Sequence, residues 1–249
     1  MKKTLPVLAC LTFVLVISDL SYLNGQTIID VETGVVFSGY NNVRIPGDQG
    51  TLFSLSKELD ASPKVFYRLR AGYTFGTRHN LSLLFAPLTV KSNGSIPRDL
   101  TFDGVVFPAN RTLIGFYKFN SYRLTYRYDI IEKPKLEFGL GLTAKIRDAS
   151  IILTSPNESS EKTNVGFVPI INFMLAWKVI DNLSLLIDGD ALAAPQGRAE
   201  DVLIAALYKI SDHIGLKAGY RILEGGADNN EVYNFALFNY AAAGLTLSF

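Results

Sequence analysis

The chain has 249 residues, with 24 lysines and arginines against 23 aspartates and glutamates and a net charge of +1. This balance gives no electrostatic case for a nucleic-acid partner, so we expect none. The single cysteine, Cys10, lies close to the N-terminus. The rest of the chain therefore offers no disulfide, thiol nucleophile or cysteine-based metal site.

The first 25 residues have the pattern of a secretory signal peptide. Two lysines precede an apolar run from Leu5 to Ile17, which a more polar segment follows. The run is shorter than the about 20 residues that a spanning helix needs, which favours cleavage over an uncleaved anchor. Lipoprotein processing at Cys10 is a weaker alternative because it would split the run. We expect cleavage before Gln26 and export of residues 26–249 as one domain.

The exported part contains runs of about ten residues in which apolar residues alternate with polar or small ones. A period of two is typical of β-strands that have one apolar face. The pattern predicts an all-β fold, a closed antiparallel up-and-down transmembrane β-barrel of ten strands. The predicted strands are residues 28–42, 65–77, 81–92, 113–130, 136–153, 165–179, 183–194, 202–211, 214–223 and 232–249.

The links between these strands alternate between two lengths. Short turns are predicted at residues 78–80, 131–135, 181–182 and 212–213, and longer links at 43–64, 93–112, 154–164, 195–201 and 224–231. All short turns should therefore lie at one end of the barrel and all longer links at the other, an asymmetry typical of such barrels. With an even number of strands, both ends of the barrel domain lie on the short-turn side.

The first two longer links carry local signals of their own. Residues 51–59 have the spacing of a short amphipathic helix with Phe53, Leu55 and Leu59 inward. In the second link, Asp103 and Gly104 predict the tip of a β-hairpin.

One face of each strand is apolar and uncharged, and the opposite face carries the charges. An arginine or lysine at lipid mid-depth costs about 2–4 kcal/mol, so the charged faces should point into the lumen. There we expect salt bridges, because an unpaired charge in a narrow lumen is costly. The predicted lumen charge network is Asp30, Glu32, Arg68, Arg70, Arg123, Arg127, Glu137, Lys145, Arg147, Asp188, Asp190, Lys217 and Arg221.

The C-terminal strand resembles the closing strand of Gram-negative outer-membrane β-barrel proteins. The insertion signal of that family runs polar, any, glycine, any, any, apolar or aromatic, any, aromatic. Gly244, Leu247 and Phe249 match it, whereas Ala242 replaces the polar residue. Aromatic residues near the short-turn ends also resemble an interfacial girdle; they are Phe75, Tyr128, Phe138, Trp177, Tyr208 and Phe249.

The resemblance covers the whole exported chain. It implies a location in the bacterial outer membrane, outer-membrane lipid around the barrel and the barrel-assembly machinery as a partner during biogenesis. Residues 122–128, 141–148 and 219–228 look like those of an uncharacterised group of such barrels, which supplies no activity.

Enzymes among outer-membrane barrels use a histidine as a base near neutral pH. His79 and His213 both fall in predicted short turns, the opposite end from the active sites of those enzymes. Asp188 and Asp190 share a strand face and could form an acid–base pair or a cation site, but pairing with arginines is the favoured interpretation. Residues 225–230 have the composition of a Ca²⁺ loop but not the ligand spacing of an EF-hand. We predict no catalytic residue, no metal site and no cofactor.

These patterns favour a non-enzymatic outer-membrane protein, a structural or surface-binding scaffold with a salt-bridged, largely occluded lumen. Its contact surface would be the first, second and fifth longer links. The basic excess of the lumen face also allows a narrow anion-preferring channel, or a carrier for a small or lipidic ligand. An outer-leaflet hydrolase that uses Asp188 and Asp190, and a soluble periplasmic lipid-binding barrel, are further alternatives.

Overall fold

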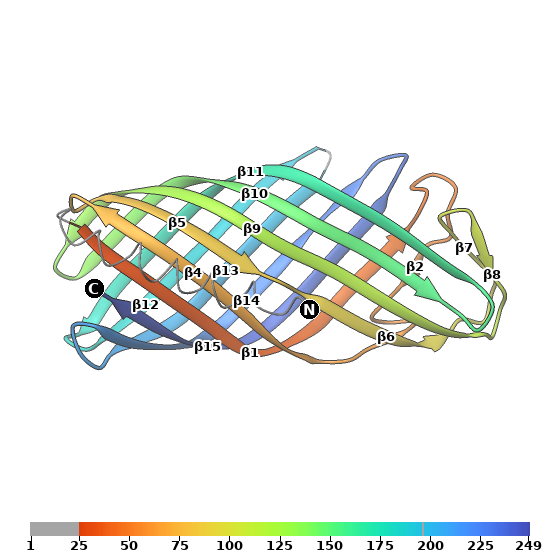
Figure 1. Cartoon of the computed structure of the whole chain (residues 1–249), viewed down its shortest axis with the longest axis horizontal. Helices are drawn as coiled ribbons and strands as arrows, with labels where there is room; N and C mark the ends of the chain where they lie inside the picture. The colour runs from red at the N-terminus through yellow and green to blue at the C-terminus, as the bar shows by residue number, and fades with distance from the viewer. Residues whose placement is uncertain (1–24, 196) are drawn as a thin grey trace, which may run out of the picture.

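The computed structural model describes residues 25–195 and 197–249, which form a closed antiparallel barrel (Figure 1). Ten strands make its wall, with β5 and β6 together forming one of them. They are β1 (Gly25–Arg44), β4 (Lys64–Phe75), β5 (His79–Ala86) with β6 (Thr89–Ser95), β9 (Thr112–Lys133), β10 (Leu136–Thr154), β11 (Ser159–Ile180), β12 (Leu183–Ala194), β13 (Gly197–Lys209), β14 (Ile214–Asp228) and β15 (Tyr233–Ser248). Pairing of β1 with β15 closes the barrel. The predicted fold is confirmed.

The predicted signal peptide and Cys10 lie outside the described residues, apart from Gly25, which begins β1. The cleavage position and the domain limits 26–249 therefore stay predictions. Within the described ranges there is no helix whose length and apolarity would let it cross a membrane.

The two ends of the barrel differ. At the turn end, tight links at residues 76–78, 134–135, 181–182 and 210–213 join the strands. The C-terminus lies there too, where the amides of Thr27 and Phe249 each donate to the other's carbonyl at 2.9 Å. Figure 1 shows this end on the left and the loop end, with β7 and β8, on the right.

At the loop end, only the first two of the predicted longer links are long. The other three are shorter than predicted, because β11 already begins at Ser159, β13 already begins at Gly197 and β14 runs to Asp228. None of the extensions has a continuous apolar face, and that of β11, Ser159 to Asn164, is polar on both faces. A strand loses its alternating pattern where both of its faces meet water, so the sequence alone indicates a loop there.

The outer face of the barrel is apolar, as predicted. Leu142 and Phe167 point outward with 68% and 67% of their surfaces exposed. Towards the loop end the same face turns polar. The apolar cross-strand pair of Tyr122 and Ile146 is followed by the polar pair of Asn120 and Asp148. Lys118 forms an ion pair with Asp148 at 2.8 Å. The apolar band therefore ends near these residues, and the strands continue beyond it.

The predicted third strand is split in two at Pro87, between β5 and β6. Proline has no amide hydrogen to donate to the ladder, so regular pairing stops. The side chain of Asn120 compensates by accepting a hydrogen bond from the Leu88 amide at 3.3 Å.

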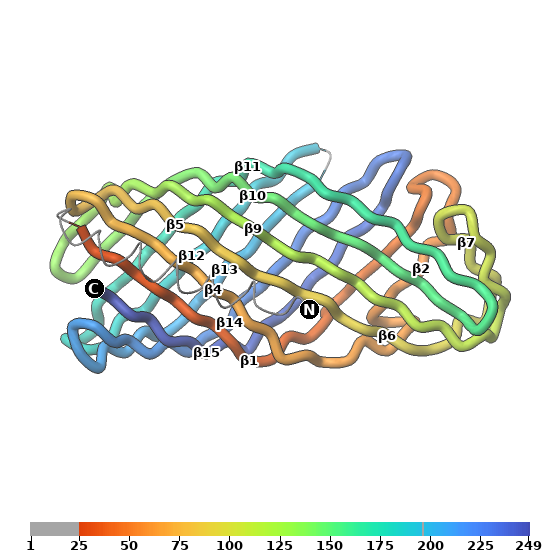
Figure 2. Tube along the Cα trace, viewed as in Figure 1, coloured from red at the N-terminus to blue at the C-terminus, as the bar shows by residue number. Residues whose placement is uncertain are grey.

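The two long links, residues 45–63 and 96–111, pack together as a loop cluster (Figure 2). β2 (Phe53–Ser54) pairs with β1, and β3 (Asp60–Ala61) pairs with β6. β7 (Leu100–Phe102) and β8 (Val105–Phe107) form the predicted hairpin. Its tip has φ of 46° at Asp103 and 82° at Gly104, the left-handed conformation that a two-residue hairpin turn requires.

The predicted helix over residues 51–59 is wrong, although the predicted inward side is right. Residues 53–54 pair with the edge of β1 instead, and the single turn that follows is held by the Ser54 carbonyl, which accepts from the Glu58 and Leu59 amides. Phe53, Leu55 and Leu59 are buried, and the Phe53 ring meets Phe102 edge-on at 6.1 Å. The β-ladder supplies hydrogen bonds that so short a helix could not match.

Candidate functional site

Asp201, near the start of β13, is the centre of the charges inside the barrel. Its carboxylate accepts from Arg68 of β4 at 2.9 Å, from Arg123 of β9 at 2.5 Å and from Arg221 of β14 at 2.5 Å. It is 2% exposed. Strands that lie far apart around the wall thus meet at one carboxylate, so these side chains cross the lumen.

Arg221 extends these contacts towards β1. It holds Glu32 with a two-pronged contact, Nε to Oε1 at 2.8 Å and Nη2 to Oε2 at 2.9 Å, the strongest geometry for this pair. Lys217 then joins Glu32, at 3.1 Å, to Asp30, at 2.6 Å.

On the other side of Asp201, Arg123 forms an ion pair with Asp190 of β12 at 2.6 Å. The second oxygen of Asp190 accepts from Thr143 at 2.6 Å and from Asn172 at 3.0 Å. We call the connected group the lumen layer; it consists of Asp30, Glu32, Arg68, Arg123, Asp190, Asp201, Lys217 and Arg221. Its four acids and four bases balance.

A second group lies nearer the turn end. Arg70 contacts Asp188 at 2.8 Å, and Arg127 contacts Asp129 at 3.1 Å and Asp188 at 4.0 Å. Gly139 leaves room for this group, because a Cβ there would lie 2.8 Å from Cδ of Arg127. Asp188 and Asp190 therefore bind different arginines instead of forming one carboxylate pair.

Ten of the thirteen predicted network residues lie in these two groups, and three do not. Glu137 is exposed at the turn-end rim, opposite Glu132. Lys145 and Arg147 form no ion pair with a carboxylate among the described residues, although both face the inside of the barrel.

The sequence pattern does not predict two members of these charge groups, Asp201 and Asp129. The predicted link over residues 195–201 places Asp201 in a loop, yet Asp201 shares its strand face with the buried residues Leu203 and Ala205. Asp129 continues the inward series of Arg123 and Arg127. Extending the alternation beyond the apolar residues would have found both.

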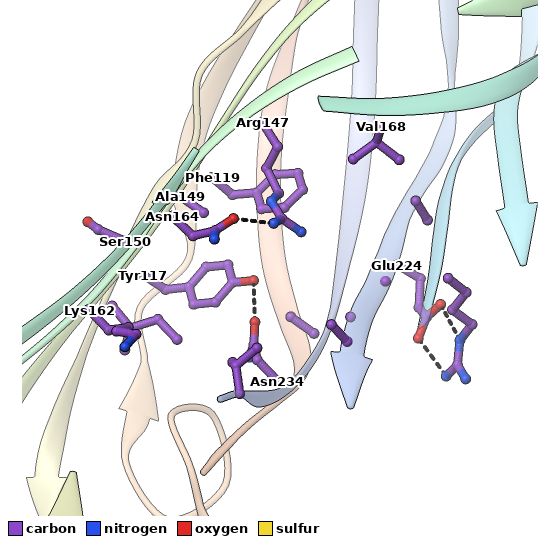
Figure 3. Close-up of a pocket in the computed structure, with 18 of the residues that line it drawn as sticks. Tyr117, Phe119, Arg147, Ala149, Ser150, Lys162, Asn164, Val168, Glu224 and Asn234 are labelled. Atoms are coloured by element: carbon purple, nitrogen blue, oxygen red, sulfur yellow. Dashed lines mark hydrogen bonds and ion pairs between the residues drawn. The ribbon is translucent and has the colours of Figure 1, made fainter. Parts of the chain in front are cut away.

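Beyond the lumen layer, towards the loop end, lies a cavity of about 220 Å³ (Figure 3). We call it the loop-end cavity. Residues of β9, β10, β11, β13, β14 and β15 line it. Its aromatic and polar lining includes Tyr117, Phe119, Lys145, Arg147, Asn164, Arg198, Glu224 and Asn234.

Several lining polar groups bind one another. Tyr117 donates to Asn234 at 3.0 Å, and Arg198 holds Glu224 through two hydrogen bonds of 2.7 Å. Glu224 also accepts from the hydroxyl of Tyr40. Figure 3 shows the contact between Tyr117 and Asn234 on a different side of the cavity from Glu224.

Lys145 and Arg147 are less completely bound. Lys145 is 2% exposed, and its ammonium lies 4.8 Å from the centre of the Phe119 ring. Arg147 donates from Nη2 to Asn164, but its Nε is buried with no hydrogen-bond partner. The loop-end cavity therefore carries two cationic side chains without a carboxylate partner among the described residues.

The two histidines lie at the turn end. Nδ1 of His79 is 2.9 Å from the hydroxyl of Tyr126, and its ring stacks on Phe75 at 5.3 Å. Nδ1 of His213 is 2.8 Å from the carbonyl of Ser248. Both are bound to wall residues at the end of the barrel opposite the loop-end cavity.

The segment with the composition of a Ca²⁺ loop is mostly strand. β14 runs to Asp228, and the turn that follows is closed by Asn229, whose side chain accepts from the amides of Glu231 and Val232 at 2.9 and 3.0 Å. The asparagine oxygen is thus used within the turn.

The residues of the predicted insertion signal lie in and beside β15, next to the closing seam. Gly244 pairs with Glu32, and Leu247 with Ile29. A Cβ at Gly244 would lie 2.5 Å from Cε of Lys217 and 2.7 Å from the Val31 carbonyl, so the position accepts no larger residue without a shift.

No protein-family model and no curated protein matches the chain. Among solved structures it is similar to the outer membrane protease OmpT of Escherichia coli, with a TM-score of 0.53 and 11% identity over 90% of this chain and 97% of that one. It is also similar to the translocator domain of the autotransporter NalP of Neisseria meningitidis, with a TM-score of 0.45 and 12% identity over 97% and 95% of the two chains. A third similar structure is Ail of Yersinia pestis, with a TM-score of 0.39 and 12% identity over 91% and 100%.

At 11% identity the likeness to OmpT concerns the fold and not the chemistry. It agrees with the barrel's own surface, in which an apolar outer face surrounds a charged interior. The chain is a ten-stranded β-barrel with the fold of the Gram-negative outer-membrane proteins.

Proposed function

We propose that this barrel is a non-enzymatic binding scaffold whose lumen is closed to solutes. The observation that carries the proposal is the lumen layer. Glu32, Arg123 and Asp201 are each at most 3% exposed, although they lie inside a barrel. Eight strands enclose an interior that side chains just fill, and ten widen it only a little, so long arginines suffice to close it.

The charge balance of the lumen layer supports the same proposal. A selective pore presents uncompensated groups of one sign to the ions that pass. In the lumen layer every arginine contacts at least one carboxylate within 2.9 Å, and the acids equal the bases in number. An ion on this path would have to separate buried pairs, which costs several kcal/mol.

Binding is proposed for the loop end, because the barrel offers prepared surfaces there. The loop cluster packs on an apolar core that continues into the barrel and holds the links in place, and Ile45 of the first link lines the loop-end cavity. Loops supported by a rigid scaffold are frequent binding sites.

The absence of catalysis is part of the proposal. Both histidines lie at the turn end and bind wall residues, and Asp188 and Asp190 are held by arginines. A carboxylate held in an ion pair is a poor general acid or base for a substrate, which argues against a hydrolase built on these residues.

Planar-bilayer recording tests the closed lumen. We expect the wild-type barrel to show no steady conductance. Arg221→Ala combined with Asp201→Ala removes one cation and one anion from the lumen layer, and this variant should conduct. Arg123→Ala with Asp190→Ala is the matched second pair, in case the first does not fold. Steady conductance of the wild type at the level of these variants would reject the closed lumen and favour the anion channel.

The alternative of a narrow anion channel or ligand carrier draws on the surplus of positive charge at Lys145 and Arg147. A channel predicts that Arg123→Ala and Arg221→Ala change the conductance of an already open barrel. A surplus confined to the loop-end cavity is better suited to binding than to conduction.

A further inference from the structure

We infer that the loop-end cavity binds a small organic carboxylate with an aromatic or aliphatic body. The inference rests on the proposed binding function and adds the class of ligand. Four steps lead to it, which concern charge, hydrogen bonding, the apolar lining and size.

The first step is charge. The lumen layer balances internally, so its carboxylates are already used by its own bases. Lys145 lies directly opposite Arg123 in the ladder between β9 and β10, and Arg147 follows two residues further towards the loop end. Side chains two residues apart share a strand face, so both cations point to the same side. They are surplus charges at one wall of the loop-end cavity.

The second step is hydrogen bonding. Among the residues that the structure describes, Nε of Arg147 has no hydrogen-bond partner, and the ammonium of Lys145 lies over the face of Phe119 without forming a hydrogen bond or ion pair. Buried donors in folded proteins are rarely left unbound, and an unmade hydrogen bond of a charged group costs free energy. An anion between Lys145 and Arg147 would give the ammonium a hydrogen-bond acceptor and the guanidinium a counter-charge.

The third step is the lining. Around the two cations the wall is apolar, with Tyr117, Phe119 and Phe238 on one side and Leu223 and Ala236 among the remaining residues. Such a wall favours a ligand with an apolar body, since water leaves both surfaces on binding.

The fourth step is size. At about 220 Å³ the cavity is smaller than the about 300–1,000 Å³ typical of sites for drug-sized ligands. A carboxylate carries one negative charge, whereas a phosphate monoester carries about 1.5–2 at neutral pH and is harder to move from water into a mostly apolar cavity. The carboxylate is therefore the anion that this lining favours.

The carboxylates that line the cavity do not neutralise the positive charge of Lys145 and Arg147. Glu224 is held by Arg198 and Tyr40. Lys162, a third lining cation, pairs with Asp103 at 3.4 Å. Glu231, in the link between β14 and β15, is exposed and forms no ion pair with Lys145 or Arg147.

The test titrates the full chain, folded in zwitterionic detergent micelles, with four probes. They are benzoate, phenyl phosphate, inorganic phosphate and benzyl alcohol, the last of which keeps the ring but lacks the charge. Backbone amide NMR shifts of Ala149, Gly225 and Gly226, which line the cavity, report binding. We expect saturable shifts with benzoate, weaker ones with either phosphate and none with benzyl alcohol.

Lys145→Gln and Arg147→Gln should each weaken benzoate binding about tenfold or more, the effect of losing one hydrogen bond to a charged group. Lys57→Gln and Arg111→Gln, both exposed and outside the cavity, are matched controls and should leave binding unchanged. Gel mobility before and after boiling shows that each variant is folded.

Unsaturable shifts with every probe, equal binding by the Gln variants, or tighter binding of phenyl phosphate or benzyl alcohol than of benzoate would each overturn the inference. Such a failure leaves the closed lumen standing if the wild type does not conduct. Conduction by the wild type would instead reject the closed lumen, whatever benzoate does.

Discussion

Gly244 shows how one residue can serve both assembly and packing. Its role in an insertion signal that the assembly machinery recognises stays a prediction. In β15 the position requires a residue without a side chain, because Lys217, which bridges Asp30 and Glu32, passes directly over it.

We expect Gly244→Ala to destabilise the folded barrel, since the added methyl group would press on Lys217 and on the Val31 carbonyl. Overpacking of this kind costs typically about 1–3 kcal/mol. Urea unfolding in detergent measures it. Gly72→Ala is the matched control, because a Cβ there would meet Ser82 at an ordinary 3.4 Å. Equal midpoints for the two variants would contradict the packing role.

Asp201 is the residue on which the lumen layer depends most. Asp201→Asn leaves Arg68, Arg123 and Arg221 with one carboxylate fewer and a surplus of buried positive charge. Breaking a buried ion pair costs about 3–5 kcal/mol, so the unfolding midpoint should fall strongly. Asp60→Asn, at an exposed position of β3, should change it little. A small effect at Asp201 would mean that water, and not the carboxylate, satisfies the arginines.

At the scale of elements, the loop cluster is stabilised by apolar packing and by one ion pair between its two links. Arg98 donates to Glu58 at 2.5 Å and to the Leu52 carbonyl at 2.9 Å. The hydrogen bond from Arg98 lowers the pKa of Glu58 below its ordinary 4.5, burial opposes this, and the Ser54 amide adds to the lowering.

The lowered pKa of Glu58 makes the stability of the loop cluster depend on pH. The ionised carboxylate stabilises the cluster fully above the ordinary pKa, and this stabilisation is lost as the pH falls through the lower pKa of the folded state. Hydrogen-exchange protection of residues 53–61 should therefore drop on acidification below about pH 4.5. In Arg98→Gln this acid-dependent loss should be much smaller. An equal loss in both proteins would assign it to other carboxylates.

The strands themselves could be predicted where lipid imposes alternation, and not beyond it. β10 and β12 match their predicted ranges within a residue. β13 and β14 do not, because Arg198 to Asp201 carries polar residues on both faces and Glu224 to Asp228 contains only acidic residues, glycine and alanine. Asp201 and six of the 24 residues that line the loop-end cavity lie in these unpredicted extensions.

At the scale of the whole molecule, the apolar band outside and the charge layer inside support the proposal that binding takes place at the loop end. The C-terminal residue beside the closing seam of the barrel allows a test of barrel assembly. Phe249 is 63% exposed, so it contributes little to packing, although it belongs to the predicted girdle and insertion signal.

We expect Phe249→Ala to slow insertion by the barrel-assembly machinery while shifting the unfolding midpoint of refolded protein less than Gly244→Ala does. Assembly kinetics in proteoliposomes, compared with urea unfolding, separates the two effects. A large loss of stability with normal insertion would make Phe249 a structural residue instead of a signal.

The sequence by itself determined the number of strands, their outward apolar and inward charged faces and the end at which the short turns lie. These properties follow from local periodicity, which lipid on one side of the wall enforces. Only the tertiary structure decided which charges meet. Arg68 and Asp201 are 133 residues apart and touch because the width and stagger of the barrel bring β4 and β13 face to face across the lumen. The same geometry left Lys145 and Arg147 beside the loop-end cavity without a carboxylate among the described residues, a consequence that no period along the chain contains.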